Sequence, residues 1–268
     1  MTRQKLVPLL ALAAVTAIAG CDGLNTGQTG NPVGVGALAA RTKGTGYTTS
    51  PQVTFYRVTS ATFVTTAGLR DTCYLAFYSE TSAGGTSSAT TVGAGSTIAL
   101  KLGVRTDTLA RAAGGADATY RTSLLAGIPF TPGDSMLFTI PGDNNGFPTS
   151  AFRGKTAEPF ALNVVTVPAA GNPVPVSWAP AASDSNAAMF ITFRYATATS
   201  TTFNRQIACT FIDDGSGTAP ASVTTDWINS TRRDVVAQRA RTILTQVPVP
   251  LSYFNIVSVF DWPTPISP

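Results

Sequence analysis

The chain has 268 residues, of which 44% are hydrophobic and 12% charged, and its formal net charge is +4. This composition is typical of a globular protein, and so small a net charge implies no polyanionic partner such as nucleic acid. The sequence contains no histidine, which excludes histidine-dependent catalytic triads, histidine metal sites and imidazole general bases.

The chain begins with a segment typical of an export signal. Arg3 and Lys5 precede an apolar run over 6–18, which is too short to span a bilayer and has the length of a signal-peptide core. The run ends in Ile18-Ala19-Gly20-Cys21, which resembles the lipobox of bacterial lipoproteins. That resemblance implies a lipoprotein signal peptide over 1–20 and lipid attached to Cys21. The alternative is an ordinary cleavable signal with a chance cysteine.

Residues 21–50 are predicted to be the lipidated cysteine followed by a flexible tether. The segment is rich in Gly and Thr and has no sustained hydrophobic periodicity. Residues 51–268 are numerous enough to bury one sizeable core. No later apolar run approaches the roughly 18 residues of a spanning helix. We therefore expect one domain held on a membrane by lipid, with the inner or outer membrane left open.

From residue 52 onward, hydrophobic residues alternate with polar ones, as in strands that bury one face. The alternating segments are 53–58, 73–77, 97–104, 136–140, 160–164, 174–178, 189–195, 207–211, 233–247 and 251–260. Turn signals such as Pro132-Gly133-Asp134 separate them. The pattern predicts an all-β fold, an antiparallel sandwich of about ten strands.

The one candidate for a helix lies around 220–229. Val223 and Trp227 are spaced as i, i+4, behind a possible cap at Thr218. We expect at most a short turn of helix there.

Once Cys21 is assigned to lipid, Cys73 and Cys209 remain as an even pair in an exported chain. Each lies on the apolar phase of its strand, Cys73 with Leu75 and Phe77, and Cys209 with its own apolar neighbours. Both sulfurs are therefore expected to point into the core and to form a disulfide within one folded unit. Two separate buried thiols are the alternative.

Several segments carry a resemblance to a known type of domain. The tract Val176-Ser177-Trp178, the strand 189–195 and the run 209–216, followed by Pro220, are similar to an Ig-like β-sandwich domain of unknown function. That domain occurs in secreted and lipid-anchored bacterial proteins. The likeness covers most of 51–247, and it implies a fold and a location but no activity.

Candidate catalytic and metal-binding groups are few. Asp213-Asp214-Gly215 and the turn over 143–146 each read as a tight turn shaped by its Asx side chains, with a cation site as the alternative. Glu80 and Glu158 are the only glutamates, and nothing places them together for glycoside hydrolysis. We therefore predict no catalytic residue, no metal site and no cofactor.

Arg233, Arg239 and Arg241 share one phase of a predicted long strand and form the main cluster of charge. A solvated strand face is the simplest interpretation, and binding of an anionic ligand is the alternative. Aromatic side chains form a second candidate surface, a stacking platform for sugars. Its candidate members are Phe190, Phe254 and Trp262.

The sequence thus favours a protein that is not an enzyme. We expect a membrane-anchored lipoprotein of the bacterial cell envelope that acts as a structural or protein-interaction module, by analogy with other Ig-like sandwiches. Its partner would be an envelope protein or a glycan, and the alternative is a carbohydrate- or anion-binding module.

Anchorage is directly testable. Mass analysis of the mature N-terminus should show a lipid-modified Cys21. The variant Cys21→Ser should lose both the modification and its place in the membrane fraction, because two or more acyl chains are what hold such a protein stably on a membrane. An unmodified N-terminus on a protein that stays in the soluble fraction would contradict the prediction.

Overall fold

The structure, a computed structural model, describes residues 31–43, 46–58, 71–78, 90–112, 119–181, 187–248, 251–262 and 268. The signal segment and Cys21 lie outside these ranges. The described residues form seventeen strands and one helix, which confirms the all-β prediction with more strands than the ten or so expected.

The chain divides into two compact units. The first comprises Met1–Thr65, Gly84–Ala157 and Arg241–Val259, and the second comprises Thr66–Ala83, Glu158–Ala240 and Phe260–Pro268. This division corrects the expectation of one domain over 51–268. Two long strands belong partly to each unit, β16 (Arg233–Pro248) and β17 (Leu251–Asp261).

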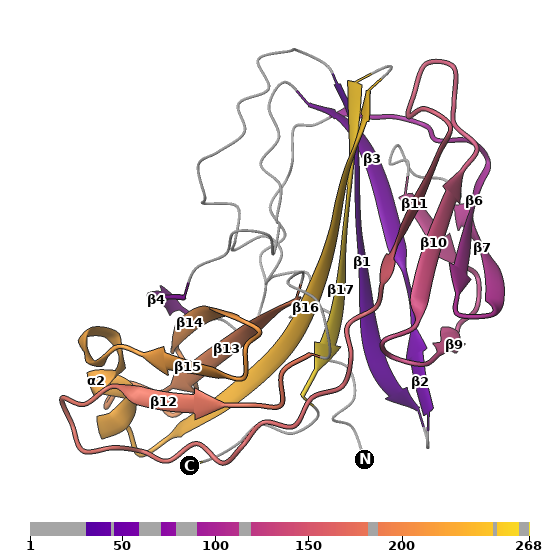
Figure 1. Cartoon of the computed structure of the whole chain (residues 1–268). Coiled ribbons are helices and arrows are strands. Elements are labelled where there is room, and N and C mark those ends of the chain that lie inside the picture. Colours follow the sequence, from indigo (N-terminus) through magenta and orange to yellow (C-terminus); the bar gives the residue numbers. More distant parts are fainter. Residues whose placement is uncertain are drawn as a thin grey trace. The chain divides into compact units, whose positions relative to one another are not determined.

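The first unit is a sheet of mostly short strands. In order across the sheet it runs β11-β10-β6-β7-β8-β3-β1, followed by the parts of β17 and β16 that belong to this unit (Figure 1). The other bounds are β1 (Asn31–Lys43), β2 (Gly46–Thr49), β3 (Gln52–Val58), β5 (Thr90–Thr91), β6 (Thr97–Leu102), β7 (Arg105–Arg111), β8 (Thr119–Thr122), β9 (Ile128–Phe130), β10 (Ser135–Ile140) and β11 (Ser150–Lys155).

Strands β1 and β2 occupy residues that the sequence predicted as tether, so the tether prediction is wrong from Asn31 onward. The glycines of β1 provide space rather than flexibility. A Cβ on Gly34 would lie 2.7 Å from the rings of both Phe55 and Phe254. Glycine at this position therefore lets two neighbouring strands bring their aromatic rings against the backbone of β1.

The core of the first unit is rich in aromatic side chains. Phe152 and Phe254 are stacked with their ring centroids 4.2 Å apart, and Phe55 meets Tyr120 edge to face at 5.6 Å. Phe254 is fully buried. It therefore packs this core and is not a member of an exposed sugar platform, as the sequence had suggested.

The second unit contains a sheet ordered β16-β13-β14-β4 and a separate pair, β12 with β15. Its bounds are β4 (Thr72–Phe77), β12 (Val174–Ser177), β13 (Ala187–Tyr195), β14 (Arg205–Ile212), β15 (Ser216–Ala219) and helix α2 (Ala221–Asn229).

Helix α2 has nine residues, more than the short turn expected, and it begins after Pro220 rather than behind a cap at Thr218. Proline suits a helix start because its missing N–H would have no partner in the first turn. Trp227 is fully buried and meets Phe193 edge to face, with ring centroids 5.1 Å apart. No helix in the described ranges has the length and apolarity needed to cross a membrane.

Two predicted strands are shorter than expected. The segment 97–104 ends at Leu102, because Gly103 with φ +57° turns the chain toward β7 and leaves Val104 99% exposed. The segment 160–164 contributes one isolated bridge, Leu162 to Trp178, and no strand. Apolar alternation alone did not reveal that, among the described residues, these positions lack a neighbouring strand with which to pair.

The close packing of β1 can be tested with two neighbouring residues on opposite faces. Gly36→Val should lower the unfolding midpoint and cost about 2–3 kcal/mol of stability, because a side chain there meets buried Ile256 and the carbonyl of Gln52. Ala37→Val, on the less buried face, should change stability by less than about 0.5 kcal/mol. Circular dichroism during urea unfolding measures both. Equal, negligible effects would indicate a flexible tether instead.

Candidate functional site

Strand β4 is the last strand of the second unit's sheet. It pairs antiparallel with β14, and Cys73 lies opposite Cys209. In the part of the chain that the structure describes, no strand pairs with its other edge (Figure 1). An edge of this kind presents unpaired backbone N–H and C=O groups to its surroundings.

The Cys73–Cys209 disulfide fastens this edge strand to its neighbour. The sulfurs are bonded and the Cα atoms are 4.1 Å apart, which confirms the predicted pairing. The sequence separation is 136 residues. In the chain-entropy model, closing a loop of that order contributes about 4–5 kcal/mol. The disulfide therefore holds a strand that pairs with only one other strand among the described residues.

The burial of β4 differs from the sequence prediction. Cys209 is buried, but Cys73 is only half-buried, and Leu75 and Phe77 are 52% and 79% exposed. On β14, by contrast, Ile207 opposite Leu75 is fully buried. The apolar alternation of β4 is real, yet these side chains lie at the rim of the unit, since no further described strand continues the sheet beyond β4.

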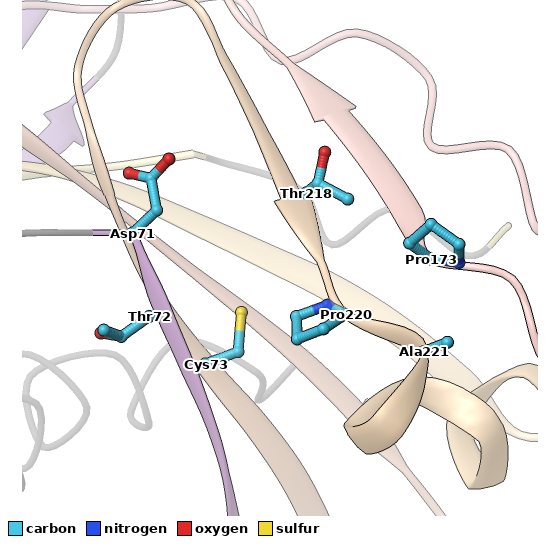
Figure 2. A pocket seen from close by; sticks show the side chains of 7 residues that line it. All are labelled: Asp71, Thr72, Cys73, Pro173, Thr218, Pro220 and Ala221. Atoms are coloured by element: carbon cyan, nitrogen blue, oxygen red, sulfur yellow. The ribbon is translucent and has the colours of Figure 1, made fainter.

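A hollow of about 430 Å³ lies beside the start of β4. Figure 2 shows the Cys73 sulfur projecting from β4 on the side opposite the Thr72 side chain. Its lining residues are Asp71, Thr72, Cys73, Pro173, Thr218, Pro220 and Ala221. Among the described residues that line the hollow, only Asp71 is ionisable, and its carboxylate accepts from the N–H of Ile212 at 3.0 Å. These described lining residues can contact a ligand but include no acid–base pair for catalysis.

Arginine and aromatic side chains gather at the other end of β4. The Arg205 guanidinium lies over the ring of Phe77 at 4.1 Å, and those of Arg194 and Arg232 lie over Phe203 at 5.2 and 5.1 Å. Such pairs are favourable because the ring face is electronegative. Exposed aromatic surface here is therefore accompanied by positive charge.

The charge of one of these arginines is balanced by a buried acid within the unit. Arg194 forms an ion pair with Asp234, and both side chains are largely buried. Burial lowers the pKa of Arg194, but the hydrogen bond and charge of Asp234 outweigh it and raise that pKa above its usual value. Arg194 thus remains charged and positions Tyr78 and Phe203 beside the end of β4.

A buried ion pair joins several segments of the second unit. The Arg239 Nε lies 2.7 Å from the Asp213 carboxylate, and both side chains are almost completely buried. Arg239 also donates to the carbonyls of Pro159 and Ala179, while Asp213 accepts from Trp178 Nε1 at 2.7 Å. Two of the segments that carry the Ig-like resemblance, the tract ending at Trp178 and the run 209–216, therefore meet at this pair.

The prediction of an exposed arginine patch on β16 is wrong. Arg239 and Arg241 are only 1% and 3% exposed, and they belong to different units. Arg233 donates to the carbonyls of Ile228 and Ser230 at the end of α2. Arg239 is covered rather than solvated because the carbonyls of Pro159 and Ala179 and the Asp213 carboxylate lie against its guanidinium.

Aspartates in the two acidic segments, 213–215 and 143–146, accept hydrogen bonds that shape tight turns. Asp214 accepts from the N–H of Ser216, Gly215 has φ +104°, and Asp143 accepts from the N–H of Asn145. Within the described ranges, no three His, Cys, Asp or Glu side chains gather as they would around a metal ion. Glu80 lies outside those ranges.

The two remaining candidates for the sugar-stacking platform do not form an exposed aromatic row. Phe190 and Trp262 are both partly buried, and Trp262 packs against Phe160 with ring centroids 5.4 Å apart. The sugar platform suggested by the sequence is therefore not assembled from these residues.

Comparisons with protein families, curated proteins and solved structures find no match for this chain. The functional argument accordingly depends on the residues described above. Sequence reasoning missed the open edge at Leu75 and Phe77 and the role of Asp213. The signal for the first was present, since the β4 sequence Thr-Cys-Tyr-Leu-Ala-Phe contains no charge, proline or glycine.

The buried ion pair predicts different costs for two adjacent acids. Asp213→Ala should destabilise the protein by about 3–5 kcal/mol, because it leaves the Arg239 charge buried without its carboxylate. Asp214→Ala, which removes only a turn hydrogen bond, should cost less than about 1 kcal/mol. Thermal unfolding followed by circular dichroism measures both. Similar losses from the two variants would show that Asp213 has no special role.

Proposed function

We propose that this protein is a non-catalytic lipoprotein of the bacterial cell envelope, anchored through lipid on Cys21, whose β-rich part is a protein-interaction module. Its contact surface is the open edge of β4. The single observation that carries the proposal is that a disulfide-fastened edge strand exposes Leu75 and Phe77 beside a buried apolar face. Exposed apolar edges of this kind are typical sites of β-strand addition.

The backbone of β4 supports this role. A Cα–Cα distance of 4.1 Å at Cys73 and Cys209 is that of a non-hydrogen-bonded pair. The N–H of Tyr78 donates to Asn204, in agreement with hydrogen bonding to the β14 side at even-numbered residues. The N–H and C=O groups of Cys73, Leu75 and Phe77 therefore point to the open edge.

The terminal strand of the first unit provides a contrast. Strand β11 carries Arg153 and Lys155, and charged residues on an edge discourage pairing with another chain. Strand β4 carries no charge along its length. The difference supports a contact role for β4 rather than a merely unprotected end.

The Ig-like sandwich architecture belongs to the same proposal. It is supported by the antiparallel pairing of β13, β14 and β4 and by the contact of Trp178 with Asp213. These features agree with a sandwich that presents an edge strand to partners.

Anion or glycan binding is a second candidate, and one observation favours it. Arg205 and Arg232 lie over the rings of Phe77 and Phe203, which combine stacking surface with positive charge. This site replaces the β16 arginines as the location of such binding.

Site-specific photocrosslinking in cells of the source organism tests the interaction role. A photoreactive benzoylphenylalanine at Phe77 should yield a discrete protein adduct, because this ring lies on the open edge. The same probe at Leu125, which is fully exposed in the first unit, is the matched control. Adducts at neither position, or equal adducts at both, would contradict the proposed surface. A glycan array with the wild-type protein tests the second candidate.

A further inference from the structure

We infer that one end of the second unit binds the anionic lipid headgroups of the membrane that carries the lipid on Cys21. This basic end is formed by Arg205, Arg232 and Arg233. The choice of a bilayer rests on the proposed anchorage, and it gives the anion-binding candidate a definite ligand, the phosphate groups of anionic lipids.

Strand pairing brings the three arginines to the same end of the sheet. Tyr195 on β13 lies opposite Arg205 on β14. Ala196, which directly follows β13, donates its N–H to the carbonyl of Arg232. Arg233 comes next along the chain and begins β16. The ends of three neighbouring strands therefore carry three guanidinium groups.

These guanidinium groups lack a full complement of acids. None of the ion pairs in the described ranges includes one of the three arginines. Burial and the charge of Asp226 raise the pKa of Tyr195, while Arg205 lowers it, so Asp226 also lies near this end. When Asp226 is counted, two positive charges of the basic end remain unbalanced among the described residues.

The acids of the same strands lie at the opposite end of the sheet. Asp71, just before β4, accepts from the N–H of Ile212 at the end of β14. The eight residues of β14 run from Arg205 to Ile212, which corresponds to about 23 Å. The Debye length is about 8 Å at physiological ionic strength. The distant acids therefore do not cancel the positive potential at the basic end.

The placement of the charges favours an extended surface over a small anion. Arg205 shares a face of the sheet with Tyr195, directly opposite it, so Arg194 points to the other face. Arg232 lies over the ring of Phe203, as Arg194 does. The guanidinium groups of Arg205 and Arg232 thus lie on different faces and do not converge on one point. A charged plane across the strand ends can contact both.

Hydrogen bonds hold this end in place before any ligand binds. Asn204 accepts from the N–H of Thr197 at 3.0 Å and donates to its hydroxyl at 2.9 Å. The Ser230 hydroxyl accepts from the N–H of Arg232 at 3.2 Å. These bonds fix the hairpin that carries Phe203 and the segment that carries Arg232. Less conformational freedom is therefore lost on binding.

The expected attraction is modest, and the anchor makes it effective. An arginine near an anionic lipid surface strengthens binding about fivefold. A few such residues would hold a free protein only weakly. A lipid on Cys21 keeps the second unit at high local concentration beside the headgroups, where a weak attraction is enough to orient it.

The test uses the full lipidated chain in vesicles, with benzoylphenylalanine at Thr201, an exposed residue of the hairpin between β13 and β14. Irradiation should give a lipid adduct, seen as a mass shift, in vesicles that contain phosphatidylglycerol. Arg205→Gln and Arg232→Gln should each lower this adduct about fivefold, as should vesicles of phosphatidylcholine alone. Arg153→Gln, at an exposed arginine of β11 in the first unit, is the matched control and should leave it unchanged.

The outcomes separate this inference from the proposed function. Equal adducts in the two kinds of vesicle, or an adduct that neither substitution lowers, would overturn it. Binding of an acidic glycan that requires Arg205 and Arg232, without a lipid adduct, would also overturn it. A chain with unmodified Cys21 that does not float with the vesicles would overturn both the anchorage and this inference. Crosslinking at Phe77 tests the protein partner separately.

Discussion

The second unit depends on one buried cation. A guanidinium with almost no exposure needs a counter-charge, and Arg239 has one in the Asp213 carboxylate, while its terminal nitrogens donate to the carbonyls of Pro159 and Ala179. These partners come from three separate segments of the chain. The Asp213 carboxylate also accepts from Trp178, which directly follows β12. The segment before β12, the end of β12 and the turn after β14 are thus all held on β16 by this one ion pair. Charge pairing and hydrogen bonds therefore specify this part of the fold as much as apolar burial does.

The other end of this sheet is organised differently. Within the described ranges, strand β4 has one neighbouring strand, and it has little buried surface and a covalent bond to β14. A strand with so few contacts would fray readily, and the disulfide opposes fraying by limiting the unfolded ensemble. The bond thus allows exposed apolar side chains to be kept at a defined place. A strand whose only role was to stabilise the unit would be expected to bury Phe77, which is instead mostly exposed to solvent. This exposure agrees with the proposed contact role.

Prediction from sequence succeeded where local pattern and covalent parity were sufficient. Alternation located β10, β13 and β14, and an even pair of cysteines in a chain predicted to be exported indicated the disulfide. It failed at β1, because glycines that allow close approach of Phe55 and Phe254 have the same composition as a flexible linker. It also failed at Arg239, since an arginine on the polar phase of a strand is solvated unless another segment covers it.

The sequence by itself determined the all-β class and which residues could form a strand or a crosslink. It also carries the prediction of an export signal. Only the tertiary structure decided which strands lie at an edge, and therefore that Ile207 is buried while Leu75 opposite it is half exposed. It likewise decided that Asp213 is a buried counter-ion while Asp214, its neighbour, shapes a turn. Periodicity depends on each residue's nearest neighbours along the chain, whereas burial and charge pairing depend on segments that approach from elsewhere in the sequence.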